Sequence, residues 1–551
     1  MVRWIILSLH MLLIATVSGC TKSTPANTIP VFNPIVNTPF QPVAWTPTPS
    51  PTDKPTATLS PTPPPNSLWL DPALPESLRS QIVLPIDFRH ASSRQNATVG
   101  IEISSNNPVS QWIYALVVPF PTVVDDIGSQ DLIATWQGEE QHLFGGAPIL
   151  MSESTFNALS VLWGLPAPEA VRVLQADKLS EQAWNTHPSW AIIPFEDLNP
   201  QWKVIAVDGI SPIHKDFDLS DYELTVPISL IGEFPLLSSI PSTNRDAEKL
   251  TTLVMTGVTA LVRATAYTME LQGITYPGQD IGPWLRAADI THISNEVPFA
   301  KDCPFPDPVQ AGVRFCSAQR YIGLLEDMGT DIIELTGDHF SDWGTEAMYN
   351  TLALYDQEGW PYYGGGATFD EGRQAVTIED HGNRLAFIGC NAKGGGFAQA
   401  SAHTPGAVRC DFDWMQTEIR RLSAAGYITI ATFQHFEYYT YAAQPNQIRD
   451  AKKLTQAGAT IVSGSQAHHP QGFEISPGSF VHHGLGNLFF DQYNYSPGTE
   501  QALIDRHIFY NGEHISTELL SIIFVDYARA RPMTAGERVA LLESVFAASG
   551  W

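Results

Sequence analysis

Five apolar runs of strand length in the second half of the chain each end abruptly in polar residues. They are ITHISNEVPF (290–299), IIELTGDHFSDWG (332–344), ITIATFQHFEYY (428–439), IVSGSQAHHPQGF (461–473) and FVHHGLGNLFFDQ (480–492). Each run predicts a buried strand, with its polar residues at the point where the strand emerges. Because the carboxyl ends of parallel strands meet at one edge of an open α/β sheet, we expect these polar residues to form one site.

Segments with helical spacing lie between these strands, at 319–329, 346–359, 414–426 and 449–458. This alternation predicts an α/β domain over residues 250–530, with helices on both faces of its sheet. The tail TAGERVALLESVFAAS (534–549) also has helical spacing, with Thr534 as a cap. We therefore expect a C-terminal helix within residues 531–551.

The first half of the chain predicts a smaller α/β domain over residues 67–235. Strand-like runs at 98–105, 112–120, 190–195 and 202–209 accompany helix-like runs at 74–83 and 155–164. A length of 551 residues also favours two cores over one. The stretches SWAIIPFEDLNPQWKVIAVDG and DLIATWQGE loosely resemble parts of periplasmic solute-binding domains. The alternative is a packing domain with no ligand of its own.

The N-terminus has the composition of an export signal. Residues 1–20 run from Arg3 through an apolar stretch to VSGC, which resembles a bacterial lipoprotein signal box and implies a lipid on Cys20. Ordinary cleavage near Gly19 is the alternative. Residues 21–66 are rich in Pro, Thr and Ser and predict a disordered linker. We expect an exported protein of the cell envelope, lipid-anchored to the outer face of the membrane.

The net charge bears on which partners the protein can bind, and the cysteines indicate which segments disulfides could join. With 30 basic and 57 acidic residues the net charge is −27, and such a surface repels nucleic acid. After Cys20, four cysteines remain, and nearest-neighbour pairing would join Cys303 to Cys316 and Cys390 to Cys410. Two other connectivities stay open. The absence of a CxxC pair disfavours a zinc site.

The polar strand ends carry residues suited to acid–base and metal chemistry. Glu296 supplies a carboxylate, and Asp338 and His339 supply a carboxylate and an imidazole in one loop. Asp342 is placed to orient the His339 ring. His435 and His468 add imidazoles, which suit a divalent transition metal. For each residue taken alone, the alternative is a hydrogen-bonded strand end.

The order of these motifs resembles the CapA family, the poly-gamma-glutamate capsule synthesis proteins, whose domain resembles calcineurin-like metallophosphoesterases. LTGDHFSDWG is similar to the family's NNHxxDxG element, QHFEYY to HWGxEY, GSQAHHPQG to GHHPHxxQG, and HGLGNLFF to SLGNF. The resemblance covers about 240 residues. It implies a four-layer sandwich in which a divalent metal (Mn, Fe or Zn) polarises a phosphate-like group and activates water.

The resemblance also implies roles for individual residues. His339 and Asp342 would be catalytic, with His339 protonating a leaving oxygen. Gln466 and Asn487 would lie beside the substrate. The metal ligands would be Glu296, Asp338, His435 and His468.

Three departures from the family pattern weaken the expected site. Val258 stands where the family has its first Asp, Ser465 and Gln466 replace the leading histidines of the fifth element, and the NLE element reads Ser294-Asn295-Glu296. Losing a carboxylate and an imidazole disfavours two metals, so the site is predicted to be mononuclear or metal-free.

Three functions follow from these patterns. The first is synthesis, anchoring or trimming of an anionic cell-surface polymer, or action on another phosphate-like substrate, by metal-assisted hydrolysis. The second is a non-catalytic protein that binds such a polymer or a small anion. The third is a structural envelope protein with neither metal nor ligand.

Overall fold

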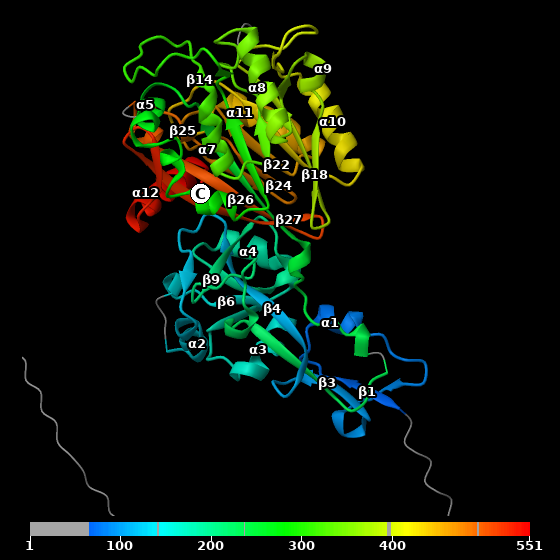
Figure 1. Ribbon diagram of the computed structural model, residues 1–551. Helices are drawn as coiled ribbons and strands as arrows, with labels where there is room; N and C mark the ends of the chain where they lie inside the picture. Colours follow the sequence, from blue (N-terminus) through cyan, green and yellow to red (C-terminus); the bar gives the residue numbers. More distant parts are fainter. Residues whose placement is uncertain (1–65, 140–142, 236, 394–397, 493–494) are drawn as a thin grey trace, which may run out of the picture. The chain divides into compact units, whose positions relative to one another are not determined.

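Two β-sheets packed face to face form the second half of the chain in the computed structural model (Figure 1). The structure describes residues 66–551 except 140–142, 236, 394–397 and 493–494. The predicted signal peptide with Cys20, the linker up to residue 65, and Gly394–Gly396 lie outside the described residues. The described residues from 66 onward belong to one compact unit.

The first sheet has the strand order β16-β15-β12-β11-β26-β27-β28, with β25 also paired to β11. β11, β12, β15, β16 and β25 run parallel, whereas β26, β27 and β28 are antiparallel to their neighbours. The bounds are β11 (Leu250–Thr259), β12 (Ile290–Asn295), β15 (Ile332–Glu334), β16 (Tyr362–Tyr363), β25 (Asn487–Phe489), β26 (Gln501–Tyr510), β27 (Glu513–Val525) and β28 (Arg529–Pro532).

The second sheet has the order β18-β19-β21-β22-β24-β23, with a parallel centre and antiparallel edges. The bounds are β18 (Val376–Asp380), β19 (Asn383–Asn391), β21 (Ile428–Gln434), β22 (Ile461–Ser465), β23 (Phe473–Ser476) and β24 (Ser479–His482). Met255 and Ile332 of the first sheet meet Phe387 and Ile430 of the second in one buried cluster. The parallel strands are buried on both faces, which explains their nearly continuous apolar sequences.

Helices cover the outer face of each sheet. The first sheet packs against α5 (Arg263–Gln272), α6 (Gly282–Arg286), α7 (Ile322–Asp327) and α8 (Thr345–Glu358). The second packs against α10 (Phe412–Ala424) and α11 (Pro445–Ala457). The predicted four-layer α/β sandwich is therefore confirmed.

Residues 66–231 form their own ten-stranded mixed sheet, with the order β2-β1-β3-β10-β4-β8-β6-β7 and with β5 and β9 paired alongside. Its strands are β1 (Ser67–Leu70), β2 (Arg89–His90), β3 (Val99–Ile103), β4 (Pro108–Pro119), β5 (Asp126–Ile127), β6 (Ile149–Ser152), β7 (Val171–Leu174), β8 (Trp190–Pro194), β9 (Trp202–Val207) and β10 (Thr225–Ile231). Its helices are α1 (Glu76–Gln81), α2 (Ser129–Gln137), α3 (Glu153–Trp163) and α4 (Leu179–Asn185). The two halves of the chain thus have separate sheets.

Short elements complete the second half. They are β13 (Phe299–Ala300), β14 (Ser317–Ala318), β17 (Gly365–Gly366), α9 (Phe369–Gly372), β20 (Gly406–Ala407) and α12 (Ala535–Ala548), the last capped by Thr534. Disulfides join Cys303 to Cys316 and Cys390 to Cys410, which is the nearest-neighbour pairing. Within the described ranges, no helix is both long and apolar enough to cross a membrane.

Candidate metal centre

The carboxyl ends of β12 and β15 bring three ionisable side chains together. Glu296 follows β12, and Asp338 and His339 lie in the loop after β15. One ligand atom from each lies within 4.8 Å of those from the other two. We call Glu296, Asp338 and His339 the carboxyl-end group.

Gly337 permits this close approach. A Cβ at position 337 would lie 2.6 Å from the Cα of Glu296, closer than real Cβ atoms come to backbone. Only glycine therefore lets the loop that carries Asp338 and His339 run against the backbone of Glu296.

Glu296 is the least satisfied member of the carboxyl-end group. The residue is 2% exposed, and within the part of the chain that the structure describes neither carboxylate oxygen has a hydrogen-bond partner. Burial raises the pKa of Glu296 well above its usual value, and the negative charge of Asp338 raises it further. An ionised carboxylate that is buried without a hydrogen-bond partner is costly, and either a proton or a bound cation removes that cost.

His339 faces Glu296 on one side and Asp342 on the other. Its Nε2 lies 4.0 Å from Glu296 Oε1, and its Nδ1 lies 2.7 Å from Asp342 Oδ2. Burial lowers the pKa of His339, but the Asp342 hydrogen bond and the charges of Glu296 and Asp338 outweigh it and raise the pKa to about 9. The hydrogen bond to Asp342 fixes the His339 ring so that Nε2 faces Glu296.

Lys393, which the sequence analysis missed, contacts the carboxyl-end group. It follows β19, and its Nζ donates to Asp338 Oδ2 at 2.5 Å and lies 3.5 Å from Glu437 Oε1. Lys393 has the same sequence pattern as the five segments above: it follows an apolar strand that ends in polar residues. Lys393 therefore supplies a positive charge within the site.

His468 lies beside the group and is engaged by other side chains. Its Nδ1 is 2.7 Å from Asn487 Oδ1, and its Nε2 is 3.3 Å from Gln466 Nε2. Burial lowers the pKa of His468 to about 4. Gln466 and His468 have positive φ angles of 72° and 50°. Such strained backbone often accompanies functional sites.

His435, like His468, was an expected metal ligand, and neither belongs to the carboxyl-end group. The Nε2 of His435 lies 3.3 Å from Asp450 Oδ2 on α11, and its Nδ1 lies 3.3 Å from Asn446 Nδ2. The structure therefore does not bring His435 together with Glu296 and Asp338. The neighbouring Gln434 contacts the group instead, through Nε2 at 3.3 Å from Asp338 Oδ1.

The sequence matches known capsule proteins over the same region. The sequence profile described as "Bacterial capsule synthesis protein PGA_cap" matches residues 252–492. Residues 252–492 belong to this bacterial capsule synthesis protein family.

Two relatives show how far the likeness extends. The capsule biosynthesis protein CapA of Bacillus anthracis is 22% identical over 297 residues, which cover 53% of this chain and 71% of that protein. The PGA biosynthesis protein CapA of Bacillus subtilis (strain 168) is 24% identical over 247 residues, which cover 44% of this chain and 64% of that protein.

Two solved structures each align with part of the chain. A 5'-nucleotidase precursor from Thermus thermophilus covers 53% of this chain and 58% of its own, with 13% identity and a TM-score of 0.30. An ABC-type phosphate transport receptor from Vibrio cholerae covers 31% and 88%, with 13% identity and a TM-score of 0.25.

The donor set of this capsule synthesis domain fits one divalent cation. Glu296 and Asp338 offer carboxylate oxygens and His339 offers Nε2, a mixed set that transition metals accept. Val258, at the place of the family's first Asp, packs with Val297, Phe315 and Phe490 in an apolar cluster. Position 258 therefore offers an apolar surface in place of a ligand atom.

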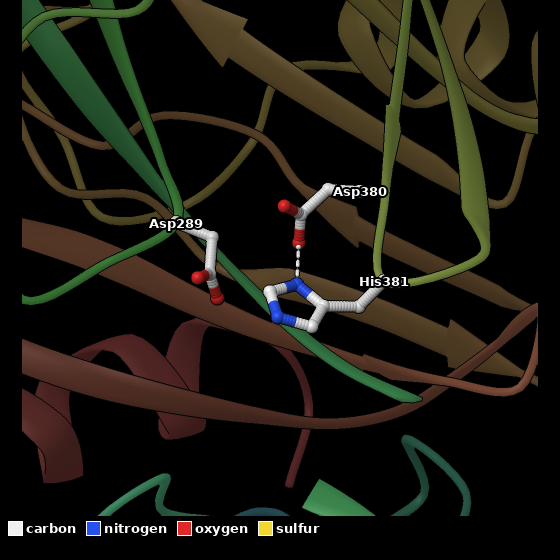
Figure 2. A group of neighbouring side chains, drawn as sticks. All are labelled: Asp289, Asp380 and His381. Carbon is white, nitrogen blue, oxygen red and sulfur yellow. Dashed lines mark hydrogen bonds and ion pairs between the residues drawn. The ribbon is translucent and has the colours of Figure 1, made fainter. Parts of the chain in front are cut away.

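A second group of two carboxylates and one histidine lies elsewhere in the domain (Figure 2). It comprises Asp289, Asp380 and His381, which we call the amino-end group because Asp289 directly precedes β12. His381 Nδ1 lies 2.6 Å from Asp380 Oδ2, and Asp289 pairs with Lys215. Asp289 also accepts hydrogen bonds from the backbone N–H and hydroxyl of Thr252. These carboxylates already have partners, so the group is an ion-pair network.

Proposed function

We propose that residues 252–492 act in the synthesis, anchoring or trimming of an anionic cell-surface polymer. We further propose that the carboxyl-end group is the active centre and holds one divalent cation for hydrolysis of a phosphate- or acyl-phosphate-like bond. The observation that carries the proposal is the buried Glu296 carboxylate, which has no hydrogen-bond partner among the described residues and lies beside Asp338 and His339.

Each residue of the centre has a defined task in this proposal. Glu296, Asp338 and His339 Nε2 hold the cation, and Asp342 keeps the His339 ring in position. When bound, a divalent cation polarises an anionic group and makes a water molecule more acidic. Lys393 neutralises Asp338 and offers an ammonium group to the anionic substrate. The family resemblance implied a proton-donating role for His339. Because its Nε2 faces Glu296, we assign it to cation binding instead.

Metal analysis of matched variants tests the proposal. The full chain, purified without chelator or affinity metal, is expected to contain about one Mn, Fe or Zn per molecule and to hydrolyse a phosphoester with added Mn, Zn or Mg. Glu296→Gln should lose both properties. Glu379→Gln, an exposed position on β18, should keep them. Equal metal content in Glu296→Gln and the parent would refute the proposed centre.

A second candidate function is recognition of the polymer without turnover. Two observations favour it: the Lys393 ammonium already supplies a cation to Asp338, and Val258 removes a family carboxylate. In that case metal is absent, while an anionic ligand raises the melting temperature of the protein. Lys393→Gln would then abolish the rise.

We also propose that the protein is exported and held at the membrane by a lipid on Cys20. The VSGC sequence at residues 17–20 and the two disulfides support export, since disulfides persist in oxidising compartments. In membrane fractionation the parent should sediment with membranes, and Cys20→Ser should appear in the soluble fraction. Membrane retention of Cys20→Ser would exclude the lipid anchor.

A further inference from the structure

A small pocket lies next to the candidate centre and uses residues outside it. Its volume is about 250 Å³, and the disulfide Cys303–Cys316 forms part of its wall. Two arginines line it: Arg263 at the start of α5, and Arg314 in the loop that the disulfide closes. A pocket with two guanidinium groups is unusual in a chain with a net charge of −27.

Both arginines keep N–H donors for a ligand. Arg263 donates through Nε and Nη2 to Asp491 Oδ1, at 2.9 and 2.6 Å. Arg314 donates through Nε to the backbone carbonyl of Asp342 at 2.6 Å. Among the described residues, Nη1 of Arg263 and both terminal nitrogens of Arg314 have no hydrogen-bond partner. The carboxylate that lines the pocket, Asp307, accepts the backbone N–H of Val309 in its own turn.

Aromatic rings hold the two guanidinium groups in place. Arg263 lies over the ring of Phe315, with Cζ 5.1 Å from the ring centroid, and Arg314 lies over Trp343 at 5.0 Å. Stacked guanidinium groups lose less freedom when they bind a planar anion. Arg263 also has a positive φ of 44°, a strained backbone at the pocket wall.

The pocket is joined directly to the carboxyl-end group. The ring centroid of Phe315 lies 4.9 Å from that of His339, and the backbone N–H of Phe315 donates to Asp342 Oδ2 at 2.9 Å. Asp342 is the residue that orients His339. A ligand in the pocket would therefore lie one aromatic ring away from the proposed reacting group.

We propose that this pocket binds a carboxylate of the anionic polymer next to the unit held at the carboxyl-end group. The free N–H donors of Arg263 and Arg314 suit a carboxylate, which guanidinium groups bind in bidentate fashion. Apolar walls from Val262, Phe305 and Phe315 suit the aliphatic stem of such a group better than a hydrated phosphate. Exposed apolar side chains on the same loop, Phe305 at 64% and Val313 at 73%, extend this surface. The inference rests on the proposed function for the nature of the polymer.

Binding of a labelled oligomer to the full chain tests the pocket. Fluorescein-labelled pentaglutamate is titrated, by fluorescence anisotropy, with the parent, with Arg314→Gln and with Arg420→Gln, an exposed arginine on α10. Loss of a charge-assisted hydrogen bond should weaken binding by about tenfold in Arg314→Gln. Arg420→Gln should bind like the parent, and labelled pentaglutamine should bind at least about tenfold more weakly than pentaglutamate.

Arg263→Lys provides a second test because lysine can keep the pair with Asp491. It should weaken pentaglutamate binding while the melting temperature stays close to that of the parent. Parent-like affinity of both arginine variants, or equal binding of pentaglutamine, would overturn the proposal. Displacement of the probe by polyphosphate but not by unlabelled pentaglutamate would overturn the carboxylate assignment.

Failure of the pocket proposal can be distinguished from failure of the proposed hydrolytic function. Anisotropy is measured with and without EDTA, and hydrolysis is measured on separate samples. If Arg314→Gln weakens binding while the parent shows neither metal nor turnover, the pocket stands and the hydrolytic function fails. If turnover is present and Arg314→Gln changes neither KM nor binding, the pocket fails and the hydrolytic function stands.

Discussion

A similar trio of residues lies at each end of strand β12, with one member of each trio next to the strand in sequence. The amino-end group has Asp289, Asp380 and His381, and the carboxyl-end group has Glu296, Asp338 and His339. In the first, Lys215 and Thr252 satisfy Asp289. In the second, Glu296 is buried and both its oxygens lack a hydrogen-bond partner among the described residues.

Composition therefore does not distinguish a candidate metal site from an ion-pair network. What differs is whether the charges have partners. A satisfied carboxylate contributes to stability, whereas a buried carboxylate without a partner destabilises the protein until a cation binds. Substitutions at the two ends of β12 should then differ in their consequences for metal binding and for stability.

The largest difference is expected for a matched pair of amide substitutions. Glu296→Gln removes a direct ligand, so its metal affinity should fall by more than the roughly 10- to 100-fold typical of an outer partner. Its melting temperature without metal should not fall, because the amide has the shape of a buried carboxyl group that has no hydrogen-bond partner among the described residues. Asp289→Asn should leave metal content unchanged. Elemental analysis and thermal unfolding check both variants, and a fall in metal content in Asp289→Asn would remove the distinction between the groups.

The carboxylates that orient the two histidines give the next comparison. Asp342 holds His339 at 2.7 Å, and Asp380 holds His381 at 2.6 Å. Asp342→Asn should weaken metal binding by about 10- to 100-fold, since it loosens a ligand. Asp380→Asn should have no effect on metal binding. Isothermal titration with Mn or Zn measures both affinities, and equal affinities would show that Asp342 does not act through His339.

His292, in the middle of β12, predicts that the free energy of unfolding depends on pH. Burial lowers the pKa of His292 to about 3, below its ordinary value of 6.5. The unfolded chain therefore binds more protons between these values, and the contribution to stability is complete above about pH 6.5 and lost as the pH falls toward 3.

This linkage gives a measurable change in the free energy of unfolding. Between pH 7 and pH 5, His292 should lower it by about 2 kcal/mol. Urea unfolding of the parent and of His292→Leu, followed by tryptophan fluorescence, measures the difference. The free energy of unfolding of His292→Leu should fall less than that of the parent between pH 7 and pH 5. Parallel pH profiles would mean that His292 is not neutral and buried in the folded protein.

The smallest effect is expected for the ion pair at the amino end. Asp289→Asn keeps an acceptor for Thr252 but loses the charge opposite Lys215, whose side chain is 35% exposed. Partly exposed pairs contribute little, so unfolding should become easier by about 1 kcal/mol or less. The loss should shrink in high salt. A salt-independent loss would assign the effect to the Thr252 hydrogen bonds instead.

The sequence predicted where the site lies better than which atoms meet there. The five strands that end in polar residues, the layering and the Glu296–Asp338–His339 segments all follow from apolar runs that break at a sheet edge. Lys393 was missed because a charged residue before a glycine run has the pattern of an ordinary loop.

Side-chain direction could not be predicted in the same way. His435 turns to Asp450 on α11, a contact that depends on how the helix packs. His468 lies on backbone with a positive φ, which no apolar pattern reveals. The pocket of Arg263 and Arg314 depends on a loop closed by a disulfide, and its residues carry no periodic signal.

The Cys303–Cys316 bridge has a consequence for how the protein matures. Both sheets form from strands outside the 303–316 loop, whereas Phe315, which packs on His339, and Arg314, which donates to the Asp342 carbonyl, lie within it. A chain made in a reducing cytoplasm should therefore form both sheets but leave the 303–316 loop, and with it one wall of the pocket, poorly ordered. Oxidation after the proposed export would then close this loop.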